Sequence, residues 1–121
     1  MSIAKIPDSE LEIMMVVWDA DGEVTSDYIM ERLHKSWLKT TVLNFLARLC
    51  ERGFLTCHKE GRVNVYEALV KRDDYLRQAS QSFLQKMHHN SLTSLVASLY
   101  DGGSVSKADL DELKKFIEAA R

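Results

Sequence analysis

The chain has 121 residues, of which 45% are hydrophobic and 28% charged, with a formal net charge of −2. This length fits one domain, or one small domain with an appendage, and the composition excludes a mainly disordered chain. No apolar run approaches the ~18 residues of a membrane-spanning helix. Residues 1–7 also lack the basic start and apolar stretch of a signal peptide. We therefore expect a cytoplasmic protein that makes no membrane contact of its own.

The charge is unevenly distributed along the chain. Residues 1–30 hold one Lys against seven Asp or Glu, a net of −6, whereas residues 31–65 hold seven Lys or Arg against three Glu, a net of +4. Residues 66–121 hold eight of each sign. Because a polyanion responds to the local field, the basic middle segment is a candidate for nucleic-acid binding.

The N-terminal segment predicts two amphipathic helices. Ser9 and Glu12 have the spacing of a capping box at the start of the first helix, which Asp21-Gly22 ends. Val24 fits a short strand, and Thr25 is placed to cap a second helix. The apolar stripes of these helices are Leu11, Met14, Val17 and Trp18 in the first, and Tyr28, Ile29 and Leu33 in the second.

A third helix is predicted from Thr40 to Arg52, and its two faces differ. One face carries Val42, Phe45, Leu46 and Leu49; the opposite face carries Thr41, Asn44 and Arg48 at i, i+3, i+7. Every amphipathic helix has a solvated face, but such faces are usually rich in Glu and Lys. Thr, Asn and Arg are instead good partners for base edges and phosphates, which favours a DNA-reading face.

A β-hairpin follows this helix. Gly53 is placed to end the helix in a left-handed conformation. Phe54–Cys57 and Arg62–Leu69 are predicted as strands around His58-Lys59-Glu60-Gly61, with Glu60-Gly61 as the tight turn. Three helices and a hairpin in this order are typical of the winged helix, a helix-turn-helix variant. We predict a mainly α fold with a small β-hairpin wing, and a winged-helix DNA-binding domain over residues 1–70.

In such a domain the third helix enters the major groove and the hairpin contacts the flanking backbone. A basic residue at the helix start and cations at the hairpin tip would then meet phosphates. An ordinary solvent-exposed turn remains an alternative for the tip. The candidate DNA-binding residues are Lys39, Thr40, Thr41, Asn44, Arg48, His58, Lys59 and Arg62.

The segment after Lys71-Arg72-Asp73-Asp74 is helical only. Its apolar residues recur at helical spacing on three segments, of which the first carries Tyr75 to Met87 and the second Leu92 to Leu99; Asp101-Gly102-Gly103 is a break, and Ser106 is placed to cap the last segment. About 50 residues of amphipathic helix bury little apolar surface alone, so we expect residues 71–121 to form a helical dimerisation domain. Its predicted contact residues are Tyr75, Phe83, Leu84, Met87, Leu92, Leu95, Val96, Leu99, Leu110, Leu113 and Ile117.

The sequence offers little for catalysis or metal binding. His34, His58, His88 and His89 are dispersed, without a Cys or carboxylate at a nucleophile–base spacing. Adjacent histidines on a helix diverge by about 100° and rarely ligate one ion. Cys50 and Cys57 lack metal-site spacing and are expected to be buried thiols. We predict no enzyme activity, no cofactor and no metal site; Trp18 and Trp37 are expected in the core.

Several segments resemble the penicillinase repressor family, the winged-helix transcriptional repressors of the BlaI, MecI and CopY type. Ile6 to Trp18 (IPDSELEIMMVVW) resembles the opening helix of the family, and Thr40 to Tyr66 (TTVLNFLARLCERGFLTCHKEGRVNVY) its recognition helix and wing. SFLQKM, LTSLVASL and the closing LDELKKFIEAAR are similar to its dimer-forming helices. The resemblance implies a homodimeric repressor that binds an inverted-repeat operator, commonly with TACA/TGTA halves, upstream of resistance or cell-envelope stress genes.

The resemblance also implies a mechanism of release. In this family a protease linked to a membrane sensor cuts the repressor at an Asn-Phe step, which corresponds here to Ser98-Leu99. The chain departs from the family pattern at this step, and also after Trp37, where Leu38-Lys39-Thr40-Thr41 replaces Ser-Pro-Lys-Thr. The Cys-x-Cys pair of the copper-responsive branch is absent, which disfavours metal sensing. The alternative function is a winged-helix module for protein contacts without specific DNA binding.

Overall fold

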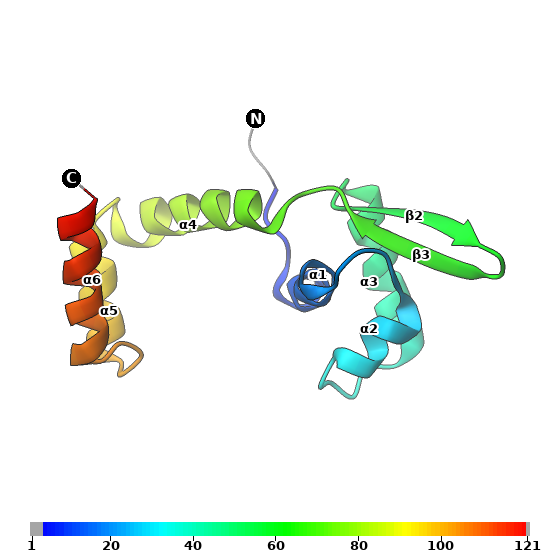
Figure 1. Cartoon of the computed structure of the whole chain (residues 1–121), viewed down its shortest axis with the longest axis horizontal. Coiled ribbons are helices and arrows are strands. Elements are labelled where there is room, and N and C mark those ends of the chain that lie inside the picture. Colours follow the sequence, from blue (N-terminus) through cyan, green and yellow to red (C-terminus); the bar gives the residue numbers. More distant parts are fainter. Residues whose placement is uncertain (1–3, 121) are drawn as a thin grey trace. The chain divides into compact units, whose positions relative to one another are not determined.

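The computed structural model describes residues 4–120 and divides into two compact units, with the division between Gln78 and Ala79. The element order is α1 (Asp8–Asp19), β1 (Val24–Thr25), α2 (Ser26–Arg32), α3 (Lys39–Glu51), β2 (Leu55–Glu60), β3 (Val63–Ala68), α4 (Arg72–His88), α5 (Leu92–Asp101) and α6 (Lys107–Ala119) (Figure 1). The predicted class, mainly α with a small β wing, is confirmed. None of the described helices is both long and apolar enough to cross a bilayer.

The helix starts follow local chemistry, with one correction. The predicted Ser9–Glu12 capping box does not form: α1 begins at Asp8 after Pro7, which has φ −57° and no side-chain cap. Ser9 therefore lies inside the first turn of α1. The residue immediately before the helix is Pro7, whose fixed φ suits a helix start. The Thr25 cap is confirmed, because its hydroxyl accepts the backbone N–H of Tyr28 at 3.1 Å.

The three strands form one antiparallel sheet in the order β1-β3-β2. Glu60 pairs with Val63, so the two turn residues are Gly61 and Arg62. The predicted Glu60-Gly61 turn is thus wrong by one residue. Gly61 has φ +66° and is the first central residue, as a type II′ hairpin requires. In consequence His58 and Lys59 lie within β2, not at the tip of the hairpin.

The core of the first unit lies where α1, α2 and α3 meet the sheet. Its largest fully buried side chains include Ile13, Met14, Ile29, Leu46 and Leu49. Burying a side chain of this size stabilises the fold by about 1.5–3 kcal/mol each. Gly53 has φ +84°, which confirms the left-handed end of α3 and lets the chain turn into β2.

Tyr75 belongs to this core and not to the dimer surface where we predicted it. Its side chain is buried, its hydroxyl accepts the Ile6 backbone N–H at 2.8 Å, and its ring packs on Trp18 and Phe54. The Trp18 indole N–H in turn donates to the Val70 carbonyl at 2.8 Å. The apolar stripe of α4 predicted burial at Tyr75, but the sequence alone does not tell which neighbour buries it.

The second unit contains the rest of α4 with α5 and α6, and its helices have well-formed ends. The Ser91 hydroxyl accepts the Ser94 N–H, and Ser106 and Asp109 form a complete capping box, which confirms the predicted Ser106 cap. Yet neither α5 nor α6 contains a buried residue. Local hydrogen bonds define these helices; side-chain burial within the unit contributes little.

Candidate nucleic-acid interface

The two faces of α3 are placed as the sequence predicts. Val42, Leu46 and Leu49 are fully buried, whereas Asn44 and Arg48 are exposed on the other side. Thr40 is also exposed at the start of the helix, and Thr41 is half-buried between the two faces. The outer face therefore offers a hydroxyl, an amide and a guanidinium along successive turns.

Phe45 lies at the border of the buried face of α3 and packs against the segment that precedes this helix. It is half-buried, and its ring meets that of Trp37 edge-on at 5.5 Å between centroids. The Arg48 guanidinium lies 6.0 Å from the centre of the Phe45 ring. This distance is at the outer limit of a cation–π contact, and the Arg48 side chain is exposed, so its charge stays available to an anion.

Ion pairs separate the basic residues of the 31–65 segment into two groups. Four of its seven cations have carboxylate partners: Arg32 with Glu31, Lys35 with Glu12, Lys39 with Asp27, and Arg52 with the buried Glu10. Arg48, Lys59 and Arg62 have none within residues 4–120. The positive charge left available to an anion thus lies on the outer face of α3 and on the hairpin, at Lys59 in β2 and Arg62 in the turn.

Two predicted phosphate contacts are modified by this pairing. The Lys39 amine lies 2.9 Å from an Asp27 carboxylate oxygen, so a phosphate would have to compete with α2 for it. His58 Nε2 lies 2.7 Å from Glu23 and 3.5 Å from Glu60. A side chain placed between two carboxylates is a weaker candidate for phosphate contact than Lys59 or Arg62.

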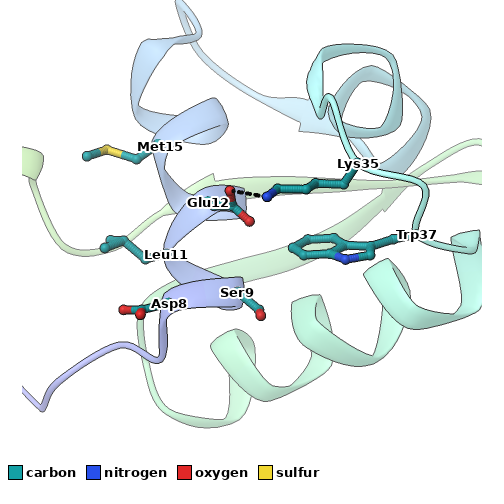
Figure 2. A pocket seen from close by; sticks show the side chains of 7 residues that line it. All are labelled: Asp8, Ser9, Leu11, Glu12, Met15, Lys35 and Trp37. Atoms are coloured by element: carbon teal, nitrogen blue, oxygen red, sulfur yellow. Dashed lines mark ion pairs between the residues drawn. The ribbon is translucent and has the colours of Figure 1, made fainter.

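A shallow hollow of about 490 Å³ lies beside the segment that leads into α3 (Figure 2). Trp37 and Lys35 line it from this segment, and Leu11, Glu12 and Met15 line it from α1. Lys35 and Glu12 approach to 3.3 Å across it. Trp37 packs on Phe45 and is half-buried, so it lies at the border of the core and not within it, where we predicted it.

The cysteines and His88 show no catalytic arrangement in the described residues. Cys50 is half-buried, but Cys57 is exposed, which corrects the prediction of two buried thiols. Burial, and then the neighbouring Cys57, raises the pKa of the Cys50 thiol and so lowers its reactivity. His88 Nδ1 lies 2.8 Å from the Ser94 hydroxyl, and no carboxylate contacts His88 there; this hydrogen bond links α4 to α5.

Comparison with known proteins assigns the chain to a family. A model of the penicillinase repressor family matches residues 6–119. The chain belongs to this family, as its sequence motifs indicated. The penicillinase repressor of Bacillus licheniformis is 35% identical over 117 residues, which cover 96% of this chain and 91% of that protein. The Staphylococcus aureus penicillinase repressor is 19% identical over 114 residues, which cover 93% of this chain and 90% of that protein.

Solved structures agree with this assignment. The solution structure of the DNA-binding domain of the repressor BlaI is 36% identical, covers 62% of this chain and 94% of that one, and superposes with a TM-score of 0.54. The B. licheniformis BlaI monomer in complex with the blaP half-operator gives 36% identity, 61% and 92% coverage and a TM-score of 0.52. The family consists of transcriptional repressors, so the chain is a repressor-type winged-helix protein and not an enzyme.

Proposed function

We propose that this chain is a dimeric transcriptional repressor that binds an inverted-repeat operator of resistance or cell-envelope stress genes, in the cytoplasm. The observation that carries the proposal is the distribution of unpaired charge. Within the described residues, Arg48, Lys59 and Arg62 keep their charge free on the recognition helix and the wing, while the other four cations of the segment are paired. BlaI, whose DNA-binding domain is 36% identical, has been solved on a half-operator.

Each candidate DNA-binding residue then has a role. Asn44 and Arg48 would read base edges, since amide and guanidinium groups pair with adenine and guanine in the major groove. Thr40 and Thr41 would contact the backbone or a thymine methyl near the start of α3. Lys59 and Arg62 would contact flanking phosphates, with Lys39 and His58 as secondary contacts because carboxylates already engage them.

Dimerisation is supported by the apolar residues that the second unit leaves exposed. Phe83 is 49% exposed, Met87 65%, Leu92 51%, Leu99 37% and Ile117 51%, while Leu84, Leu95, Val96, Leu110 and Leu113 are half-buried. A second copy would cover these side chains in a two-fold interface and present two recognition helices to two half-sites.

Release by proteolysis at Ser98-Leu99 is a further part of the proposal. Both carbonyls sit at the C-terminal end of α5, where that of Ser98 accepts the Gly102 N–H and that of Leu99 accepts the Ser104 N–H. A cut there would detach α6 and remove Leu110, Leu113 and Ile117 from the dimer interface. The enzyme would be a metalloprotease linked to a membrane sensor, and the last turn of α5 must open before it can act.

The experiment is to recover and sequence the genomic DNA that binds the full chain, and then to titrate the enriched duplex. We expect the enriched DNA to contain an inverted repeat. The parent chain should prefer this duplex over a scrambled one, and Asn44→Ala should lose that preference. Lys35→Ala, whose amine is paired with Glu12, is the matched control and should keep the preference. If no sequence is enriched and Asn44→Ala changes nothing, the alternative of a protein-interaction module replaces this proposal.

A further inference from the structure

The strand register gathers three potential metal ligands on one face of the sheet. Thr25 and His58 both pair with Val65, one from each side, so the two point to the same face. Glu23 lies two residues before Thr25, and Glu60 two residues after His58. Because side chains alternate along a strand, Glu60 shares that face. Glu23 precedes β1, and its carboxylate reaches the same face, since it lies 2.7 Å from His58 Nε2.

The distances bring these side chains to within coordination range of one point. His58 Nε2 lies 2.7 Å from Glu23 Oε2 and 3.5 Å from Glu60 Oε1, and all three ligand atoms lie within 4.8 Å of one another. Zinc binds His nitrogen and carboxylate oxygen at about 2.0–2.2 Å, so two ligands at a tetrahedral angle stand about 3.4 Å apart. Small side-chain rotations alone would therefore bring all three onto one ion.

We propose that Glu23, His58 and Glu60 form a binding site for a divalent first-row transition-metal ion. One imidazole with two carboxylates suits zinc and its neighbours better than Ca²⁺ or Mg²⁺, which take oxygen ligands only. The three side chains are 37%, 46% and 61% exposed, so water completes the coordination shell. This site is separate from the Cys-x-Cys motif of the copper-responsive branch, which the chain lacks.

The site would act on the wing. Without metal, two carboxylates lie beside the β2 strand that carries Lys59, and their charge opposes the approach of a phosphate. A bound dication neutralises them and ties the residue preceding β1 to β2 across β3. This effect on DNA rests on the proposed function, whereas metal binding itself does not.

The test is a Zn²⁺ titration of the metal-free full chain, followed by NMR of its ¹⁵N-labelled histidine rings, with the His58 signal identified from His58→Gln. We expect one equivalent of Zn²⁺ to shift the His58 Nε2 signal. Glu23→Gln, which keeps the shape of the side chain, should weaken Zn²⁺ binding roughly tenfold or more, because the ion loses an anionic ligand. Glu31→Gln, a change of an exposed glutamate on α2, is the matched control and should bind as the parent does.

Either of two results overturns the site: a His58 signal that does not move, or Glu23→Gln binding Zn²⁺ as tightly as the parent. The three side chains would then interact only with one another, through the two His58–glutamate contacts, and would bind no metal ion. In the second arm, Zn²⁺ should strengthen binding of a scrambled duplex severalfold in the parent and not in Glu23→Gln. If Zn²⁺ binds at His58 but the affinity for DNA does not change, the effect on the wing is refuted. If the chain binds no DNA either with or without Zn²⁺, the proposed function is refuted instead.

Discussion

The two units of this chain contain helices of similar length and amphipathic pattern, yet only one of them builds a core. In the first, α1, α2 and α3 bury Ile13, Ile29, Leu46 and Leu49 completely. In the second, α5 and α6 have no fully buried side chain, and Phe116 and Ile117 are 69% and 51% exposed. The difference comes from the sheet, which gives the first three helices a surface to close on. An amphipathic pattern therefore predicts that a face will be covered, but not by what.

Removing α6 should have the largest effect, because the second unit is expected to cover its apolar residues by dimerisation. A chain ending at Ser98 lacks Leu110, Leu113 and Ile117 and should be monomeric by sedimentation at micromolar concentration. Its affinity for a full operator should fall by about 10²–10⁴, the usual gain from linking two sites, while its affinity for a half-site should match the parent. A truncated chain that remains dimeric and binds the full operator like the parent would exclude cleavage as the release mechanism.

Replacing one apolar side chain by alanine in each unit should have different consequences, because one unit has a core of its own and the other does not. Leu46→Ala removes a fully buried side chain and should lower the free energy of unfolding of the first unit by about 2–5 kcal/mol. We expect that loss of stability to be the same at every protein concentration. Ile117→Ala should instead raise the dissociation constant of the dimer, measured by sedimentation over a series of concentrations, whereas Leu46→Ala should leave that constant unchanged. A dissociation constant that is unchanged in Ile117→Ala would mean that Ile117 makes no intermolecular contact.

On the proposed DNA-reading face of α3, Arg48→Ala should weaken binding of the preferred operator by about 1–3 kcal/mol and relax the base preference at one position. Arg77→Ala is the control: this exposed guanidinium pairs with Asp74 on α4, outside the recognition helix. Titration of operator and scrambled duplexes with both variants measures the effect. Arg48→Ala binding the operator like the parent would show that α3 reads DNA through another face.

The wing should contribute a smaller effect that does not depend on sequence. Lys59→Ala or Arg62→Ala should weaken operator and scrambled duplexes alike, and each should lower the slope of log affinity against log salt by about one, because one fewer phosphate is neutralised. His58→Ala should change this slope less, because Glu23 already engages the imidazole. Measuring all three variants over a series of salt concentrations gives the comparison. A slope unchanged in Lys59→Ala and Arg62→Ala would place the wing off the DNA.

Most features set by local sequence were predictable, although the Ser9–Glu12 capping box does not form and the hairpin turn lies one residue later than predicted. The periodicity of α3 identified its buried and exposed faces, and the hydroxyls of Thr25 and Ser106 identified two helix starts. Features set by pairing between distant segments were not. The proximity of Glu23 to His58 follows from strand register, and that of Lys39 to Asp27 from the packing of α2 beside α3. Tyr75 illustrates the same limit, because its apolar character indicated burial without naming the partner.

The smallest predicted effect concerns the local hydrogen bonds on which the second unit depends. The Ser106 backbone N–H, and then its hydroxyl, donate to Asp109 and hold the pKa of that carboxyl below its ordinary value of 3.8. Since the folded pKa is depressed, the stabilisation of α6 is complete above the unfolded pKa and is lost as the pH falls through the folded one. Asp109→Asn should therefore reduce the helicity of α6 at neutral pH and abolish its loss in acid, as read from the NMR shifts of the α6 backbone. Asp111→Asn, which leaves the capping box intact, should titrate like the parent. If both variants behave alike, the cap does not stabilise α6, and contacts with a second copy must hold this helix instead.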